Sequence, residues 1–136
     1  MTNLNDTPHV LTLALLPARL ALCRLSSNDP IPVWAAGARA FMSITRTPAE
    51  LSIVADEEVV PPEVKAERGY RSLRVEGPLP LTLVGIIAAI SEPLAAAGVP
   101  IFPIATYDTD YVIMRESDVA KAVASLRAAG HRVYNK

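Results

Sequence analysis

The hydrophobic pattern in the second half of the chain changes from a strand period to a helix period. Apolar and polar side chains alternate over Tyr70–Glu76 (YRSLRVE), which is typical of a strand, and Gly77-Pro78 then interrupts the pattern. Pro80 fits the first turn of a following helix, because the N–H that proline lacks has no intrahelical partner there. The apolar residues that then recur at helical spacing are Leu83, Ile86, Ile87, Ile90 and Leu94.

Two residues determine how this predicted helix continues and ends. Gly98 is placed to end it in a left-handed conformation. Pro93 lies in its interior, where it removes one backbone hydrogen bond and clashes with the preceding turn. We therefore expect a kink or a restart near Ser91.

A hairpin and a second helix complete this half of the chain. The arms are predicted over Ile101–Thr106 and Tyr111–Arg115, and His131–Tyr134 predicts a last short strand. Ser117 is positioned to cap the second helix and Gly130 to end it. The apolar face of that helix carries Val119, Val123 and Leu126. The order strand, helix, strand, strand, helix, strand is the ferredoxin-like plan, an antiparallel sheet of four strands with two helices on one face.

The first half of the chain shows a similar pattern with weaker helix signals. Strands are predicted over Val10–Leu15 and Leu20–Leu25, joined at Pro17. Pro30–Ala36 has room for one short helical turn before Gly37.

A further hairpin, Phe41–Thr45 with Leu51–Ala55, indicates an internal repeat. Aligned with the later hairpin, it sets Glu50 against Asp110, with one extra residue in the earlier turn. The two halves of the chain are therefore predicted to be a degenerate repeat.

The segment between the halves has the composition of a connection. Asp56–Gly69 (DEEVVPPEVKAERG) is rich in charge and contains two adjacent prolines, which is typical of a link between packed units. The sequence therefore predicts a degenerate N-terminal unit over residues 1–60 and a C-terminal unit over residues 61–136.

Composition limits the classes of partner. The chain is 51% hydrophobic, which predicts a globular protein with either a large core or an apolar face that binds a partner. Its 13 basic and 14 acidic residues balance, so no surface for binding nucleic acid is predicted. The opening residues MTNLNDT lack the basic region of a secretory signal, and the apolar run Val10–Leu16 is too short to cross a bilayer. A soluble, cytoplasmic protein without a membrane partner is expected.

Groups that could carry catalysis are few. Cys23, the only cysteine, lies in an apolar run and is most simply a buried hydrophobe. Neither His9 nor His131 lies where it would predict a catalytic pair with Cys23. The sequence has no Gly-rich phosphate loop, no metal-ligand cluster and no nucleophile beside a base, so it predicts no cofactor, no metal and no enzymatic activity.

The segment Ile101–Asp118 places a polar cluster between two apolar runs. The cluster consists of Thr106, Tyr107, Asp108, Thr109 and Asp110. A ligand with an amino group would find a negative charge and hydrogen-bond acceptors at such a hairpin tip. The alternative is that Asp108 and Thr109 only form the turn, since their short side chains bond the nearby backbone, and that Asp110 pairs with a Lys or Arg.

Three segments resemble ACT-domain proteins, and more closely the small tandem-ACT family related to the CASTOR-type arginine sensors. The segments are FMSITRTPAELSIV at Phe41–Val54, YRSLRVEGPLPLTLVGIIAAISEPLAAAGVPIF at Tyr70–Phe102 and IATYDTDYVIMRESDVAKAVASLRAAGH at Ile104–His131. The last contains the most distinctive pattern, a Thr and Tyr followed by Thr-Asp-Tyr and an aliphatic strand. Ala105 departs from the family pattern, in which Ser is common, and so removes one hydroxyl contact.

The resemblance implies an α+β fold of two ACT-like units, each ferredoxin-like with βαββαβ order, the N-terminal one degenerate. It also implies a homodimer that is not an enzyme and binds a small ligand, usually an amino acid, at an interface between ACT units. The alternative is a ligand-free ACT module used for dimerisation or protein interaction.

The resemblance places the ligand between the loop after the first strand and the hairpin strand. The implied binding residues are Gly77, Pro78, Leu79, Ile104, Ala105, Thr106 and Asp110. Asp110 would receive the ligand ammonium, and backbone N–H groups around Gly77, Leu79 and the loop to Leu81 would receive the carboxylate at a helix start. An aliphatic lining would favour an apolar ligand side chain, whereas Asp108 would suit a basic one.

Overall fold

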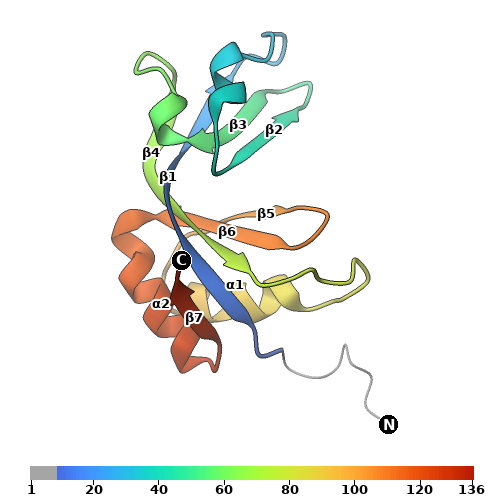
Figure 1. Ribbon diagram of the computed structural model, residues 1–136, viewed down its shortest axis with the longest axis vertical. Helices are drawn as coiled ribbons and strands as arrows, with labels where there is room; N and C mark the ends of the chain where they lie inside the picture. Colours follow the sequence, from blue (N-terminus) through green and yellow to red (C-terminus); the bar gives the residue numbers. More distant parts are fainter. Residues whose placement is uncertain (1–8) are drawn as a thin grey trace. The chain divides into compact units, whose positions relative to one another are not determined.

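The computed structural model describes residues 9–136, which form two compact units. The terminal unit comprises the described residues up to Pro17 together with Arg71–Lys136, and the inserted unit comprises Ala18–Tyr70. Strands β1 (Thr12–Leu25) and β4 (Ala66–Val75) each begin in one unit and end in the other (Figure 1). The inserted unit is therefore an insertion within the sequence of the terminal unit.

This division differs from the predicted boundary between residues 1–60 and 61–136, of which residues 1–8 lie outside the described part. The first part of β1, Thr12–Leu15, pairs in parallel with β7 (Arg132–Asn135) in the terminal unit. Its second part, Leu20–Leu25, pairs antiparallel with β3 (Leu51–Asp56) in the inserted unit. An alternating pattern shows that a strand forms but not which strands it pairs with.

Strand β1 is continuous, so the prediction of two strands joined at Pro17 is wrong. It runs over 14 residues. Pro17 is exposed and lies between the part paired with β7 and the part paired with β3. A proline that lacks a backbone donor is tolerated at such a position in a strand.

The terminal unit has the predicted ferredoxin-like order with one added strand. Its remaining elements are α1 (Ile86–Ala96), β5 (Phe102–Ala105), β6 (Asp110–Arg115) and α2 (Val119–Ala128), the last preceded by the 3-10 turn η4 (Glu116–Asp118). The strand order is β7-β1-β4-β6-β5. The first part of β1 therefore lies between β4 and β7, which are neighbours in the predicted sheet of four strands.

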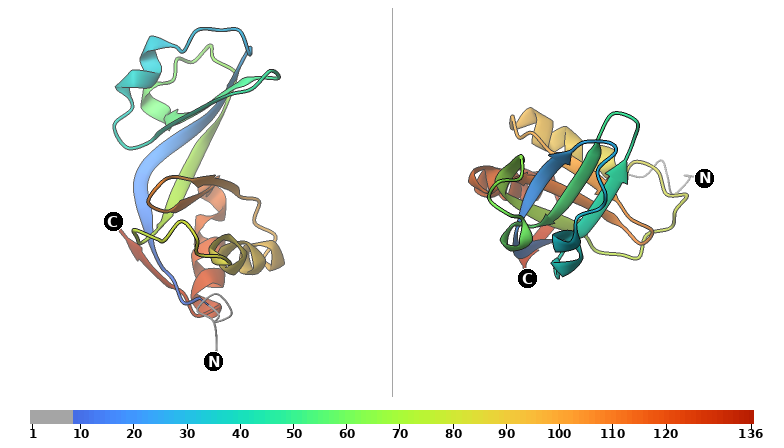
Figure 2. Two further views of the ribbon diagram at one scale, coloured as in Figure 1. Left: turned by 90° about the vertical axis from the view of Figure 1, so that its right-hand side faces the viewer. Right: turned by 90° about the horizontal axis from the view of Figure 1, so that it is seen from above.

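The core of the terminal unit lies between its sheet and its two helices, which cover one face of the sheet (Figures 1 and 2). Alternate residues of each strand point to this face, because successive side chains of a strand point to opposite sides. The central buried residues are Leu13, Leu15, Leu73, Val75, Ile90, Leu94, Val112, Met114 and Leu126.

The helix ends differ in part from prediction. Gly98 (φ 73°) and Gly130 (φ 96°) follow α1 and α2 in the left-handed conformation, as predicted. Helix α1 starts only at Ile86, because Gly85 before it is left-handed (φ 89°), and so Pro80 and Leu83 lie in a loop instead of the helix. The predicted cap by Ser117 is wrong, since no side chain caps α2 and Ser117 lies in η4.

Pro93 lies inside α1, which continues through it as one helix without the expected restart. A residue with an N–H at this position would bond the Ala89 carbonyl. That carbonyl instead accepts a hydrogen bond from Nε2 of His131 at 2.9 Å, and Nδ1 of His131 accepts one from the Leu11 N–H at 3.1 Å. The buried His131, which follows α2, therefore links α1 to the residue just before β1.

The inserted unit repeats the same order of strands with 3-10 turns in the helix positions. Its further elements are η2 (Val33–Gly37), β2 (Met42–Arg46) and η3 (Glu57–Val59), and its strand order is β2-β3-β1-β4. The predicted hairpin and the short turn before Gly37 are confirmed. The inserted unit thus has a ferredoxin-like order of elements without α-helices, and its core lies around Leu51, Ile53 and Ala35.

Asp56 at the end of β3 is a buried carboxylate that sequence reasoning missed. Its oxygens accept hydrogen bonds from the backbone N–H groups of Arg39, Ala40 and Phe41 at 2.9–3.2 Å. Burial alone raises the pKa of Asp56, but these hydrogen bonds outweigh burial, so its pKa lies below the ordinary value. The carboxylate holds the connection from η2 to β2.

Replacing Asp56 by Ala is expected to lower the free energy of unfolding by about 2 kcal/mol at pH 7, because three backbone donors lose a charged acceptor. Since folding lowers the pKa of Asp56, its contribution is complete above the unfolded-state pKa near ~4 and is lost as the pH falls through the native value. Urea unfolding from pH 7 to pH 3 measures this loss. The exposed Glu63→Gln serves as the control, and a constant difference between wild type and Asp56→Ala across this range would contradict the assignment.

His131→Ala is expected to lower the free energy of unfolding by about 2–3 kcal/mol, since the Ala89 carbonyl and the Leu11 N–H both lose their partner. Pro93→Ala restores an N–H that can bond Ala89. It should therefore stabilise the His131→Ala protein more than it stabilises the wild type. Urea unfolding of the four proteins gives the coupling energy, and strict additivity would show that His131 does not compensate for Pro93.

Candidate functional site

The loop after β4 packs directly on the turn between β5 and β6. The Leu79 N–H donates to the Asp108 carbonyl at 2.7 Å, and the buried Thr109 hydroxyl donates to the Val75 carbonyl at 2.6 Å. These two bonds join the loop to the turn on both sides of Gly77-Pro78. The loop and the turn therefore form one wall.

Gly77 has no room for a side chain in this contact. A Cβ atom there would lie 3.1 Å from the Asp108 carbonyl oxygen, 3.1 Å from the Leu79 nitrogen and 3.2 Å from Cβ of Thr109. The first two neighbours are backbone atoms, which cannot rotate away. Any other residue would push these neighbours apart by a few tenths of an ångström, so glycine favours the close approach.

The threonine hydroxyl groups of the turn already bond backbone groups, that of Thr106 within the turn and that of Thr109 at the end of β4. The Thr106 N–H and hydroxyl both donate to the Thr109 carbonyl, at 2.8 Å and 3.0 Å. Thr109 takes part in the turn, as the alternative interpretation of Asp108 and Thr109 expected, and its partner in the turn is Thr106. That interpretation does not account for the carboxylates of Asp108 and Asp110.

A cavity of about 160 Å³ opens between the loop and the turn. Four of the predicted binding residues line it: Leu79, Ala105, Thr106 and Asp110. The lining residues that were not predicted as binding residues are Pro80, Leu81, Leu83, Ile86, Tyr107, Asp108 and Thr109. Leu83 and Ile86 were assigned to a helix face, and only the left-handed Gly85 separates the loop from that helix.

Asp110 is the half-buried carboxylate of this cavity. Burial raises the pKa of Asp110, and among the described residues no hydrogen bond or ion pair to its side chain offsets that burial. The predicted alternative, a pair with a Lys or Arg, is therefore not found in the described part of the chain. Asp56 shows the opposite case, since its burial is offset by three backbone donors.

The N-terminus of α1 lies at the same cavity through Ile86. The first intrahelical bond runs from the Ala89 N–H to the Gly85 carbonyl, at 3.0 Å, and no side chain caps the helix. The N–H groups of Ile86, Ile87 and Ala88 precede that bond, so they have no partner within the helix. The Leu79 N–H, predicted as a donor to the ligand, is instead bonded to Asp108.

The other predicted binding residues lie elsewhere. Gly77 and Pro78 line a second cavity of about 280 Å³, on the other side of the turn, and Thr106 lines both cavities. Ile104 pairs with Tyr111 across the hairpin and lines neither cavity. The predicted single site is thus divided between two cavities.

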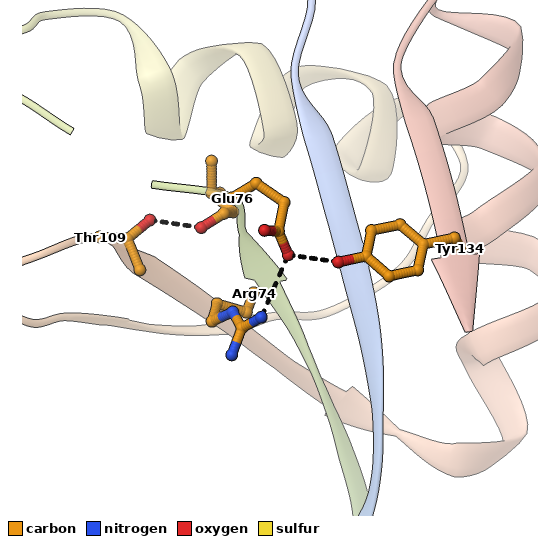
Figure 3. Close-up of polar contacts among 5 residues, drawn as sticks. Arg74, Glu76, Thr109 and Tyr134 are labelled. Atoms are coloured by element: carbon orange, nitrogen blue, oxygen red, sulfur yellow. Dashed lines mark hydrogen bonds and ion pairs between the residues drawn. The ribbon is translucent and has the colours of Figure 1, made fainter. Parts of the chain in front are cut away.

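A chain of polar contacts supports the residue before Gly77 (Figure 3). Oε1 of Glu76 accepts hydrogen bonds from the Tyr134 hydroxyl at 2.6 Å and from Nη2 of Arg74 at 3.1 Å. These bonds lower the pKa of Glu76, and the carboxylate in turn raises the pKa of Tyr134. The side chain of Glu76 is therefore held in one orientation by strands β4 and β7.

The described residues contain few groups suited to catalysis. Burial raises the pKa of the Cys23 thiol, which disfavours the thiolate form that a nucleophile needs. Both ring nitrogens of His131 bond backbone groups. Over residues 9–136 no three His, Cys, Asp or Glu side chains are grouped to hold a metal, and no helix is long and apolar enough to cross a membrane.

Gly77→Ala is expected to lower the free energy of unfolding by about 1–3 kcal/mol, because the added Cβ presses on two backbone atoms and separates the loop from the turn. Gly37→Ala is the matched control, since its Cβ would lie 3.7 Å from Val59 in ordinary contact. Thermal unfolding of both variants measures the difference. Equal stability of the two would contradict the close contact at Gly77.

Comparison with known proteins gives two family matches. Residues 65–128 match the family described as ACT domain, and residues 19–63 match a second family, described as an N-terminal domain.

Solved structures agree with these matches. The ligand-free regulatory subunit of aspartate kinase from Thermus thermophilus is 16% identical, with 89% of this chain and 99% of that chain covered and a TM-score of 0.60. A Vibrio cholerae protein of unknown function, described as a possible transport protein, is 17% identical over 88% and 90% of the two chains, with a TM-score of 0.71. At these identities the two likenesses show the fold alone.

A protein of Agrobacterium tumefaciens is more similar, at 33% identity over 94% of this chain and 95% of that chain, with a TM-score of 0.88. This chain therefore belongs to the same family as the Agrobacterium protein, and its residues 65–128 match the ACT-domain family.

Proposed function

We propose that this chain is a regulatory module without catalytic activity that binds an amino acid in the cavity between Leu79 and Asp110. The observation that carries the proposal is the Asp110 carboxylate, which is half-buried and has no partner among the described residues. Removing a carboxylate from water is unfavourable unless a cation or donors replace the lost hydration. A ligand ammonium supplies both a positive charge and donors.

The N-terminus of α1 suits the ligand carboxylate. The N–H groups of Ile86 and Ile87 precede the first intrahelical hydrogen bond, and the end of the helix carries a partial positive charge. Asp110 and this helix end thus offer opposite charges within one cavity. That arrangement matches the two charged groups of a free amino acid.

The size and lining of the cavity favour a ligand of modest size. A cavity of about 150 Å³ is known to hold benzene, and this one is about 160 Å³. Leu79, Leu83 and Ile86 suit an apolar side chain, whereas Asp108 at the rim suits a basic one. An arginine ligand, as in the CASTOR-type sensors, would have to extend toward Asp108 and out of the cavity.

A second copy of the chain is proposed to cover the mouth of the cavity. Leu81, Val84 and Tyr107 are apolar or aromatic and are exposed by 69%, 54% and 81%. Leu81 and Tyr107 belong to the lining. Burying these side chains in a homodimer would remove apolar surface from water and enclose the ligand between ACT units.

Regulation would then follow from linkage between ligand and assembly. A ligand bound at the interface stabilises the arrangement that binds it best, and so changes which surface is presented to a partner. The ACT match and the likeness to the regulatory subunit of an aspartate kinase support a regulatory role. The exposed side chains of Leu81, Val84 and Tyr107 also favour the second candidate function, that of a ligand-free dimerisation or protein-interaction module.

Asp110→Asn tests the proposal. A thermal-shift screen of the dialysed wild type against the common amino acids should give a selective rise, since a ligand at a hundred times its dissociation constant adds about 2.7 kcal/mol. The variant should lose this rise because it lacks the anion. Asp108→Asn, two residues away on the same turn, is the matched control and should keep the response to neutral amino acids.

The stability of Asp110→Asn without any ligand gives an independent test. Folding raises the pKa of Asp110, so the native state disfavours its ionised form, and this penalty appears as the pH rises from the unfolded pKa through the native one. Above both values, Asp110→Asn should therefore be at least as stable as the wild type. Loss of stability at pH 7 would indicate an undetected structural partner, and a wild type that responds to no amino acid would favour the ligand-free module.

A further inference from the structure

The second cavity is separate from the proposed amino-acid site. It lies between the end of β4 and the start of β6, with Arg74 and Glu76 on one side and Tyr111 on the other. Its volume is about 280 Å³. Thr106, Asp108 and Thr109 line both cavities, whereas Asp110 lines only the first.

Glu76 presents a fixed hydrogen-bond acceptor to this cavity. Its Oε1 holds the bonds from Tyr134 and Arg74, at 2.6 Å and 3.1 Å, so the plane of the carboxylate is set by two strands (Figure 3). Oε2 has no partner among the described residues, and the side chain is 37% exposed. A ligand would therefore find an acceptor that is already oriented, which reduces the entropy lost on binding.

Arg74 presents donors beside that acceptor. Its guanidinium is planar and carries five N–H groups. Nη2 donates to Glu76, and Tyr111 also interacts with the guanidinium. Its side chain is 25% exposed and forms part of the cavity lining. Donor and acceptor groups thus lie next to each other on the side of the cavity formed by Arg74 and Glu76.

The charged side chains that line the second cavity are largely paired with each other. Arg74 and Glu76 form an ion pair, and the remaining carboxylate, Asp108, is exposed. An anionic ligand would meet Glu76 and Asp108 with no unpaired cation in the lining. A neutral ligand whose groups both donate and accept fits this cavity better, and a hydroxyl is such a group.

We propose that the second cavity binds a neutral ligand through a pair of neighbouring hydroxyls, one accepting from Arg74 and one donating to Oε2 of Glu76. The rings of Pro78 and Tyr111 line the same cavity and offer apolar surface to the carbon face of such a ligand. A free monosaccharide and the ribose of a nucleoside both carry this group. The site is independent of the amino-acid site, because it uses neither Asp110 nor the N-terminus of α1.

Amide chemical shifts of the full chain under titration test this site. The two probes are adenosine and D-ribose, the latter used as its methyl furanoside. The control is 2-deoxyribose, also used as its methyl furanoside, because the locked five-membered ring then carries no pair of neighbouring hydroxyls. We expect saturable shifts at Gly77, Asp108 and Tyr111 with D-ribose, adenosine or both, and at least tenfold weaker binding of 2-deoxyribose. Stronger binding of adenosine than of ribose would identify a nucleoside as the source of the diol, and the reverse a free sugar.

Glu76→Gln tests the role of the acceptor Oε2. The glutamine carbonyl can keep the bonds from Tyr134 and Arg74, while its NH₂ group replaces the acceptor Oε2 with a donor. Ribose binding should weaken at least tenfold without loss of the native spectrum. Arg74→Gln should have the same effect, and either variant suffices if the other fails to fold.

Asp110→Asn is the matched control and should leave ribose binding unchanged. This variant also separates the two proposals, because it removes the amino-acid response and not the diol response. Absence of saturable shifts with both probes would overturn the diol site. Equal binding of 2-deoxyribose, unchanged affinity in Glu76→Gln, or stronger binding of a simple amine such as butylamine at the same amides would overturn it too.

Discussion

The contact between the loop after β4 and the β5–β6 turn determines the geometry of everything proposed for this chain. Two hydrogen bonds join them, Leu79 to Asp108 at 2.7 Å and Thr109 to Val75 at 2.6 Å, and Gly77 lets the backbones approach. Because residues of the loop and of the turn line both cavities, a shift of the loop would change the shape of both. The proposed ligand recognition thus depends on a contact made mostly by backbone atoms, which holds the loop on the turn but offers few side chains to a ligand.

The two partly desolvated carboxylates show how the fold divides structural from functional groups. Asp56 receives three backbone N–H groups, and its lowered pKa records that the native state stabilises its charge. The Asp110 carboxylate accepts no hydrogen bond among the described residues, and its pKa is raised because burial of its charge is not compensated. The residue type is the same in both places. A carboxylate that destabilises the native state when ionised is a better candidate for ligand binding than one that holds a turn.

Local sequence patterns correctly predicted the elements that depend on neighbouring residues. They failed for features that depend on residues far away along the chain. The hairpin before Arg115 and the left-handed glycines after both helices follow from periodicity and turn chemistry. The path of β1 does not, since its alternation is compatible with any partner strand. The site was predicted as one set of residues, because the sequence marks a polar turn beside Gly77. Its division into two cavities follows from how closely the loop packs on the turn at Gly77, where an added Cβ would lie 3.1–3.2 Å from its neighbours, and no local pattern encodes that packing.

The family match over residues 65–128 contains the loop and the turn but omits what fixes the start of the loop. The Glu76 N–H donates to the Thr12 carbonyl at 2.8 Å, and the Glu76 side chain is bonded by Tyr134. Thr12 belongs to β1 and Tyr134 to β7, and both strands lie outside the matched segment. Since Glu76 directly precedes Gly77, the first described strand of the chain and its last strand together determine where the loop after β4 begins. The ACT segment alone therefore does not contain all the residues that hold the proposed binding loop in place, because both ends of the terminal unit contribute to it.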